Sequence, residues 1–142
     1  MSESETPQKF SKEEINNLLL AAQQLEQQAS RYSQQMEILN SYYNEIQSSE
    51  QTLIEIKESK GSHKILMPIG AGNFIYATIE DTEKVIVTIG AGVHSEKSLP
   101  NAIDGLKKKK EEVENQLTQI KSSYNEVLER LREIDRVVKT VM

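Results

Sequence analysis

The segment ILMPIGAGNFIYATIEDTEKVIVTIGAGVHSEK, residues 65–97, decides the fold of this chain. It consists of two similar halves, and in each half a Gly-Ala-Gly triplet lies between two strand-like runs. Runs rich in β-branched and aromatic residues are typical of strands, and a short glycine-rich link between two of them is typical of a hairpin turn. The segment therefore predicts two β-hairpins in succession, joined by the link DTE at residues 81–83.

A glycine-rich turn after an apolar run is also found in nucleotide-binding loops. The dinucleotide fingerprint needs a third glycine three residues after the second, and a helix that follows the loop. Ile75 and Ser95 occupy the third-glycine positions here, and strand-like sequence follows both triplets. The triplets are therefore interpreted as hairpin turns, in which glycine supplies a positive φ.

A long helix is predicted before the hairpins, over residues 10–60. Ser11 and Glu14 have the spacing of a capping box, and Phe10 and Ile15 flank it as a hydrophobic staple. Apolar residues then recur in steps of three and four, a repeat typical of a coiled-coil seam. Glu50 is the one polar residue in this seam, whose other members are Ile15, Leu18, Ala22, Leu25, Ala29, Tyr32, Met36, Leu39, Tyr43, Ile46 and Leu53.

A second helix with the same repeat is predicted after the hairpins, over residues 99–142. Pro100 lies near its start, where proline is tolerated, and Gly105 inside it costs about 1 kcal/mol relative to alanine. Lys110 is the one polar residue in the second seam, whose other members are Ile103, Leu106, Val113, Leu117, Ile120, Tyr124, Val127, Leu131, Ile134, Val138 and Val141.

The two seams are equally long, so the chain can fold back on itself with paired residue numbers that sum to 156. Ile15 then faces Val141, Leu53 faces Ile103, and the two polar residues fall in adjacent layers. Two interpretations stay open for Glu50 and Lys110: a diagonal contact in the seam, or two side chains that extend separately to water. The predicted fold class is α+β, an antiparallel two-helix coiled coil with two β-hairpins inserted at the bend, over residues 61–98.

Composition favours an elongated protein of the cytoplasm. Only 37% of the 142 residues are hydrophobic, no cysteine is present for a disulfide, and no apolar run approaches a membrane span. The net charge of −5 argues against nucleic-acid and anionic-membrane partners. The polar residues 1–9 do not resemble a signal peptide, and a disordered tail is expected there.

The strands are apolar on both faces, as Ile65 and Leu66 or Val85 and Ile86 illustrate. Strands of this kind need cover on both sides, and two hairpins without a helix packed on them are marginal alone. The coiled coil is expected to lead away from them, so the cover and the missing strand partners should come from other chains. The residues expected to make this oligomerisation contact are Ile65, Met67, Ile69, Phe74, Ile75, Val85, Val87, Ile89 and Val93.

No catalytic group or cofactor site is predicted. His63 and His94 are the only histidines, and no convergent ligand set accompanies them, so they are interpreted as strand-end residues and no metal is expected. The run of lysines from Lys107 to Lys110 is followed at once by Glu111 and Glu112, as on a solvated helix face. The chain is not expected to be an enzyme.

Surplus apolar residues gather where the two ends of the coil should meet. Leu19 and Leu20 lie off the first seam beside Leu18, and Val137 lies off the second seam, with Met142 beyond it. Two interpretations stay open from this pattern alone. The residues form a binding surface, or they thicken the seam at ends that would otherwise fray.

The chain resembles the alpha class of prefoldin subunits of the archaeal type. The doubled strand–Gly-x-Gly–strand pattern of residues 65–109 carries the resemblance, together with the V-x-x-S pattern that begins at Val93 and leads to the second helix with slightly different spacing. The two flanking helices agree in length and heptad character. Beta-class subunits have one hairpin, so the doubling is the feature that indicates the alpha class.

The resemblance implies an ATP-independent co-chaperone that delivers non-native proteins to a group II chaperonin. It implies a hexamer of two alpha and four beta subunits, with the hairpins in a double β-barrel platform and the clients held at the coil tips. It favours the binding-surface interpretation of the tips. The client contacts it implies are Leu18, Leu19, Leu20, Val137, Val141 and Met142. The alternative is a structural coiled-coil protein or a filament-forming relative of prefoldin.

Overall fold

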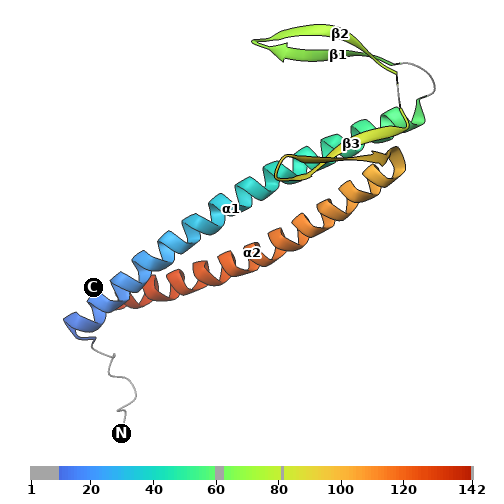
Figure 1. Ribbon diagram of the computed structural model, residues 1–142. Helices are drawn as coiled ribbons and strands as arrows, with labels where there is room; N and C mark the ends of the chain where they lie inside the picture. The colour runs from blue at the N-terminus through green and yellow to red at the C-terminus, as the bar shows by residue number, and fades with distance from the viewer. Residues whose placement is uncertain (1–9, 60–62, 81, 142) are drawn as a thin grey trace. The chain divides into compact units, whose positions relative to one another are not determined.

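The computed structural model describes residues 10–59, 63–80 and 82–141. In chain order the elements are α1 (Lys12–Glu58), β1 (His63–Gly70), β2 (Asn73–Ile79), β3 (Lys84–Gly90), β4 (Val93–Ser98) and α2 (Leu99–Val141) (Figure 1). Two long helices with two β-hairpins between them confirm the predicted α+β fold. The expected disordered tail, residues 1–9, lies outside the described residues.

The chain divides into two compact units. The first, called the helix-end unit, holds the first part of α1, up to Ser41, and the last part of α2, from Asn115 onward. The second, called the hairpin unit, is Tyr42–Glu114, with the rest of both helices and all four strands.

Both helices begin at side-chain caps. At the start of α1 the Ser11 amide donates to Glu14 Oε2 over 3.3 Å, and the Glu14 amide donates to Ser11 Oγ over 3.2 Å. This reciprocal pair is the predicted capping box. At the start of α2, Ser98 Oγ accepts a hydrogen bond from the Asn101 amide, and the Leu99 amide donates to the Glu83 carbonyl over 2.8 Å. Both groups satisfy amides that have no partner within the helix.

The burial pattern of the two helices confirms the predicted seams. Every described seam residue is buried or half-buried, and most positions between them are exposed. Ala29 and Val127, predicted to share one layer, are both buried in the helix-end unit. In the hairpin unit Ile46, Ile103 and Val113 are buried. The 3.5-residue repeat therefore fixes which stripe of each helix leaves water.

The two hairpins are separate two-stranded antiparallel sheets with the same turn geometry. β1 pairs with β2, β3 pairs with β4, and a bulge precedes each turn. Ala71 and Gly72 have φ of 51° and 78°, and the corresponding Ala91 and Gly92 have 49° and 76°. Two successive central residues with positive φ are characteristic of a type I′ turn, whose twist matches that of the strands.

Substitutions at two glycines are expected to act in opposite directions. Gly105 lies inside α2 and a Cβ there would meet nothing within 4 Å, so Gly105→Ala should raise the free energy of unfolding by about 1 kcal/mol. Gly72 also has open space around it, but its positive φ is unfavourable for alanine, so Gly72→Ala should lower that free energy by about 1 kcal/mol. Urea denaturation followed by circular dichroism measures both. A destabilising Gly105→Ala would show that another chain occupies the space beside it.

Candidate interaction surfaces

Strand register assigns the residues of hairpin 1, formed by β1 and β2, to two faces. Ile65 is paired with Ala77 and Met67 with Ile75, which places these four on one face, called the inner face. Leu66 is paired with Tyr76 and Pro68 with Phe74, which places these on the opposite, outer face.

Hairpin 2, formed by β3 and β4, has faces built in the same way. Its inner face carries Val85 and Val87, which are half-buried, opposite Lys97 and Ser95. Its outer face carries the cross-strand pairs Ile86 with Glu96 and Thr88 with His94. The remaining predicted contact residues, Ile69, Ile89 and Val93, lie beside the turns and are exposed.

The expectation that no helix lies beside the hairpins was wrong for hairpin 2. A cavity of about 170 Å³ in the hairpin unit is lined by Val85 and Val87 of β3 together with Leu53 of α1 and Leu106 of α2. Part of the inner face of hairpin 2 therefore meets the chain's own helices. The predicted contact residues of hairpin 1, in contrast, are all exposed.

Three residues outside the predicted contact set are among the most exposed apolar side chains of the strands. They are Leu66, Tyr76 and Ile86, all on the outer faces. The sequence shows Leu66 and Ile86 as apolar, but only the cross-strand register places Tyr76 on the same face as Leu66. The alternation of side chains along each strand separates Leu66 and Ile86 from their neighbours, but the pairing of Tyr76 with Leu66 depends on where the bulge falls.

The predicted client-contact residues lie at the end of the helix-end unit, where the start of α1 and the end of α2 come together (Figure 1). Leu19 and Leu20 are 48% and 59% exposed. Leu18, Val137 and Val141 are half-buried, as expected for residues in or beside the seam. Met142 lies outside the described residues. The described tip therefore combines a partly buried apolar base with two leucines open to water.

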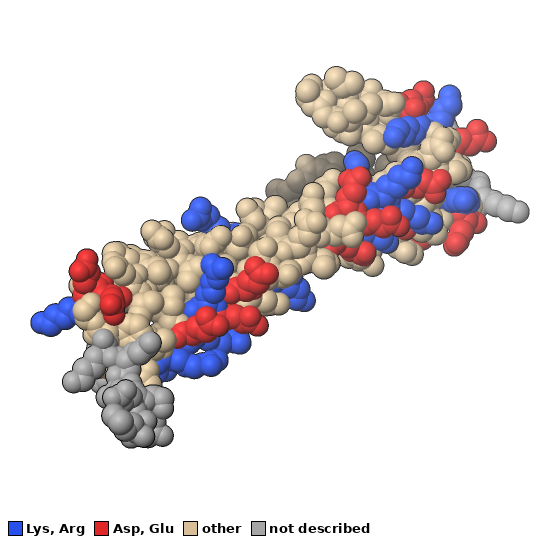
Figure 2. Space-filling model, turned by 90° about the horizontal axis from the view of Figure 1, so that it is seen from below, with Lys and Arg blue, Asp and Glu red and all other residues tan. Residues whose placement is uncertain are grey.

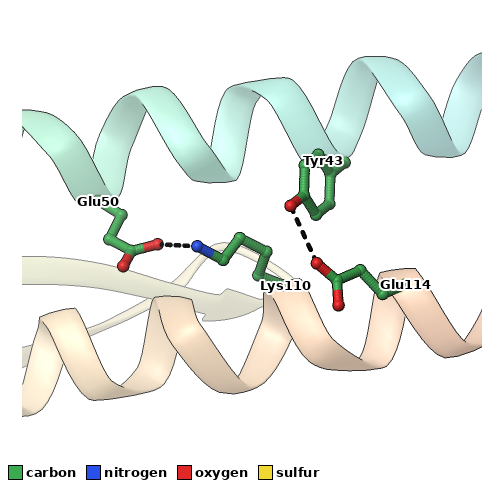
Figure 3. Close-up of polar contacts among 4 residues, drawn as sticks. All are labelled: Tyr43, Glu50, Lys110 and Glu114. Carbon is green, nitrogen blue, oxygen red and sulfur yellow. Dashed lines mark hydrogen bonds and ion pairs between the residues drawn. The ribbon is translucent and has the colours of Figure 1, made fainter.

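The diagonal contact between the two polar seam residues is present. Lys110 Nζ lies 2.8 Å from Glu50 Oε2, and Glu50 is only 7% exposed (Figure 3). One turn further along α2 and about two turns back along α1, the Tyr43 hydroxyl donates to Glu114 Oε1 over 2.9 Å (Figure 3). Residue numbers rise along α1 as their partners' numbers fall along α2, so the helices of the hairpin unit are antiparallel in the predicted register.

Both contacts favour the protonated form of their donor. The hydrogen bond to Glu50 raises the pKa of the Lys110 ammonium. The hydrogen bond to Glu114 raises the pKa of the Tyr43 phenol. In each case the partner carboxylate stabilises the form that carries the proton.

Replacing one partner of the Glu50–Lys110 pair should destabilise the coil more than replacing both. Lys110→Met leaves a buried carboxylate without its cation, whereas Glu50→Leu with Lys110→Leu fills the seam with apolar groups. We expect the single variant to lower the Tm by several degrees and the double variant to keep or raise it. Thermal unfolding followed by circular dichroism gives the Tm of the wild type and of both variants, and so ranks their stabilities. A single variant as stable as the wild type would show that the pair does not contribute.

The coil should lose stability in alkaline solution. The pKa values of Lys110 and Tyr43 are higher in the folded chain than in the unfolded chain. Their hydrogen bonds therefore contribute fully to stability at a pH below the ordinary pKa values of about 10, and this contribution is lost as the pH rises through the raised pKa values. The Tm of the wild type should therefore fall more steeply above about pH 10 than that of the Glu50→Leu, Lys110→Leu, Tyr43→Phe variant. Parallel curves for the two proteins would contradict this assignment.

Neither Gly-Ala-Gly triplet opens a helix, since β2 follows the first and β4 follows the second. This geometry confirms the interpretation of both as hairpin turns. His63 begins β1, and His94 Nδ1 lies 3.0 Å from Thr88 Oγ1. Among the described residues, no three His, Cys, Asp or Glu side chains lie close enough together to hold a metal ion.

Acidic and basic side chains alternate along α2 in the hairpin unit. Lys107 and Lys108 are exposed, and so are Glu111 and Glu112, each four residues further along the helix. Blue and red side chains intermingle on the face that Figure 2 shows. In the described part of the chain, neither helix is apolar enough over a sufficient length to cross a membrane.

The family model of prefoldin, described as "Prefoldin subunit", matches residues 9–142. The chain belongs to the prefoldin family. A prefoldin subunit alpha of Methanococcoides burtonii is 30% identical over 128 residues, which cover 90% of this chain and 93% of the relative. That of Pyrococcus horikoshii is 32% identical over 90% of this chain and 87% of the relative. These relatives confirm the resemblance to the alpha class.

A solved structure agrees with the prefoldin fold. The chain of a filamentous PFD from Methanocaldococcus jannaschii, determined by cryo-EM, superposes with a TM-score of 0.69. The match covers 82% of this prefoldin chain and 96% of that chain, at 16% sequence identity. At this identity the likeness concerns the fold, which is two helices with two β-hairpins between them.

Proposed function

We propose that this prefoldin chain is a subunit of an ATP-independent co-chaperone that captures non-native proteins at its tip and passes them to a group II chaperonin in the cytoplasm. The observation that carries the proposal is the tip of the helix-end unit, where Leu19 and Leu20 are exposed beside the half-buried Leu18, Val137 and Val141. Exposed aliphatic side chains on a polar shaft offer contacts that do not depend on the client's sequence. Prefoldin is a chaperone family, which supports this role.

The hairpins support assembly with other subunits. Their strands leave large apolar side chains in water when the chain is alone, and two-stranded sheets are marginal without further cover. We propose that the inner face of hairpin 1, together with the part of hairpin 2 that the chain's own helices leave open, joins the hairpins of beta-class prefoldin subunits in a double β-barrel, with two copies of this chain and four beta subunits. Such an assembly would bring several tips to one client and increase avidity.

Light scattering of an aggregating client tests this function. The assembled complex should suppress aggregation without ATP, and a chain shortened at both tips, without residues 12–22 and 134–142, should assemble but no longer suppress it. Suppression that survives the truncation would place client binding elsewhere. Loss of assembly in the shortened chain would show that the tips also hold the subunits together.

A filament-forming subunit is the second candidate, because the similar solved structure is described as a filamentous PFD. Native mass measurement separates the two. A closed hexamer gives one mass with a beta-class partner, whereas a filament gives an open-ended series from this chain alone.

A further inference from the structure

The two hairpins have the same geometry, but the residues on their inner faces differ. Their turns have matching φ values, and the glycines of the two turns define which position of hairpin 2 corresponds to each position of hairpin 1. On hairpin 1 the cross-strand pair Met67 with Ile75 is apolar on both strands. The corresponding pair on hairpin 2 is Val87 with Ser95, in which only β3 contributes an apolar side chain. The inner face of hairpin 2 is therefore suited to a different contact.

The apolar strand of hairpin 2 faces the helices of its own chain. Val85 and Val87 of β3 are half-buried, and so is Ser95, which is paired with Val87. The two valines line the cavity of about 170 Å³ whose other side is formed by both helices. The apolar residues of that side, called the neck, are Leu53 of α1 and Ala102, Gly105 and Leu106 of α2.

Burial and hydrogen bonding at the start of α2 support this docked arrangement. Ala102 is not a seam residue, yet it is buried. Leu99 is buried too, and its amide donates to the carbonyl of Glu83, the residue directly before β3, over 2.8 Å. A backbone hydrogen bond thus connects the start of α2 to the start of hairpin 2, and the apolar contact along β3 adds to it. On hairpin 1 the corresponding β1 residues, Ile65 and Met67, are exposed.

We propose that hairpin 2 is the joint between the coil and the barrel: β3 stays docked on the neck of its own chain in the assembled complex, and this contact fixes the direction of the coil. The proposal rests on the proposed assembly and gives each hairpin a separate role in it. Hairpin 1 contacts other subunits through an inner face that is apolar on both strands. Hairpin 2 turns β3 toward its own helices, while Lys97 of β4 lies at the edge of the cavity and is exposed to water. A coil held in one direction brings its tip to a client together with the other tips.

An engineered disulfide tests whether the docked contact persists in the complex, since the chain has no cysteine of its own. Val87→Cys and Gly105→Cys place one thiol on β3 and one on α2 beside the same cavity, and a Cβ at Gly105 meets nothing within 4 Å. After assembly under reducing conditions, oxidation should join the two thiols within one chain. The native mass and the suppression of client aggregation should stay as they were in the reduced complex. Met67→Cys with Gly105→Cys uses the corresponding position of hairpin 1 and should form a disulfide at least tenfold more slowly. Val85→Cys with Ala102→Cys repeats the test at a second place.

The absence of a disulfide from both cysteine pairs in the complex would overturn the proposal, because β3 would then have left the neck. An oxidised complex that dissociates or no longer suppresses aggregation would also overturn it, because hairpin 2 would then have to leave its helices in order to function. The native mass and client suppression of the wild type and of the reduced complexes are measured before oxidation. A failure of the proposed function is seen there, independently of the disulfide result.

Time-resolved fluorescence anisotropy tests whether the docked contact fixes the coil. A dye on Glu45→Cys, an exposed position of α1, reports the motion of the coil in the assembled complex. Ala102→Asp places a carboxylate in the docked contact and should at least double the amplitude of the fast depolarisation, with the native mass and the helical circular dichroism unchanged. Lys108→Asp, at an exposed position of the same helix, should leave the amplitude as it is in the wild type. Equal amplitudes in all three proteins would overturn the proposal. A loss of native mass in Ala102→Asp alone would also overturn it, because the contact would then hold subunits together instead of holding a coil to its own hairpin.

Discussion

Replacing Met67 with Asp is expected to release the chain from its assembly while both helices stay folded. Met67 lies on the inner face of hairpin 1, opposite Ile75. A carboxylate in an apolar interface without a partner costs about 3 kcal/mol, which weakens association roughly a hundredfold. Analytical ultracentrifugation should show smaller species, and circular dichroism should keep its helical signal.

A charge change on a helix provides the control. Lys108→Asp alters the charge by more than Met67→Asp does, but its side chain is exposed on α2. It should leave the assembled mass unchanged. If Met67→Asp also leaves the mass unchanged, the inner face of hairpin 1 is not an assembly surface. If it abolishes the helical signal, the substitution acts on folding rather than on association.

The coiled coil could be predicted at the level of single residue pairs. A helical seam depends on a local period, so the sequence alone indicated that Ala29 and Val127 share a layer and that Lys110 can reach Glu50. The structure has both residues of the first pair buried and the second pair in contact. The capping box at Ser11 was equally local, because it involves groups three residues apart.

The faces of the hairpins could not be predicted in the same way. Side chains alternate with a period of two, so a shift of one residue in register moves a residue to the other face. The bulge before the turn makes such a shift. Gly70 is paired with Asn73, and an unbroken ladder from that pair would place Leu66 opposite Ala77. Because of the bulge, Leu66 is paired with Tyr76 instead. A glycine triplet does not reveal where the bulge falls, so Tyr76 was not recognised as a surface residue.

Leu19→Gln together with Leu20→Gln is expected to abolish most of the client binding without changing the assembly. Glutamine has nearly the helix propensity of leucine, so α1 should remain intact. Each leucine contributes about 1.5 kcal/mol or more when a client covers it, and the loss of both weakens one tip contact roughly a hundredfold. Because several tips hold one client, the effect on the complex should be larger still. Suppression of client aggregation and the native mass are the two measurements.

Ile38 provides a matched control for the tip. It is an aliphatic residue of the same helix, it is 70% exposed, and it lies on the shaft away from the helix end. If position at the tip matters, Ile38→Gln should suppress aggregation as well as the wild type does. If Ile38→Gln weakens suppression as much as the double leucine variant, clients bind along the whole shaft and exposed apolar area, rather than the tip, determines binding. Each of these substitutions replaces an exposed aliphatic side chain of α1 by the same glutamine amide. A difference in client binding between the two variants therefore reflects where the side chain lies on the helix, and not the kind of side chain that is lost.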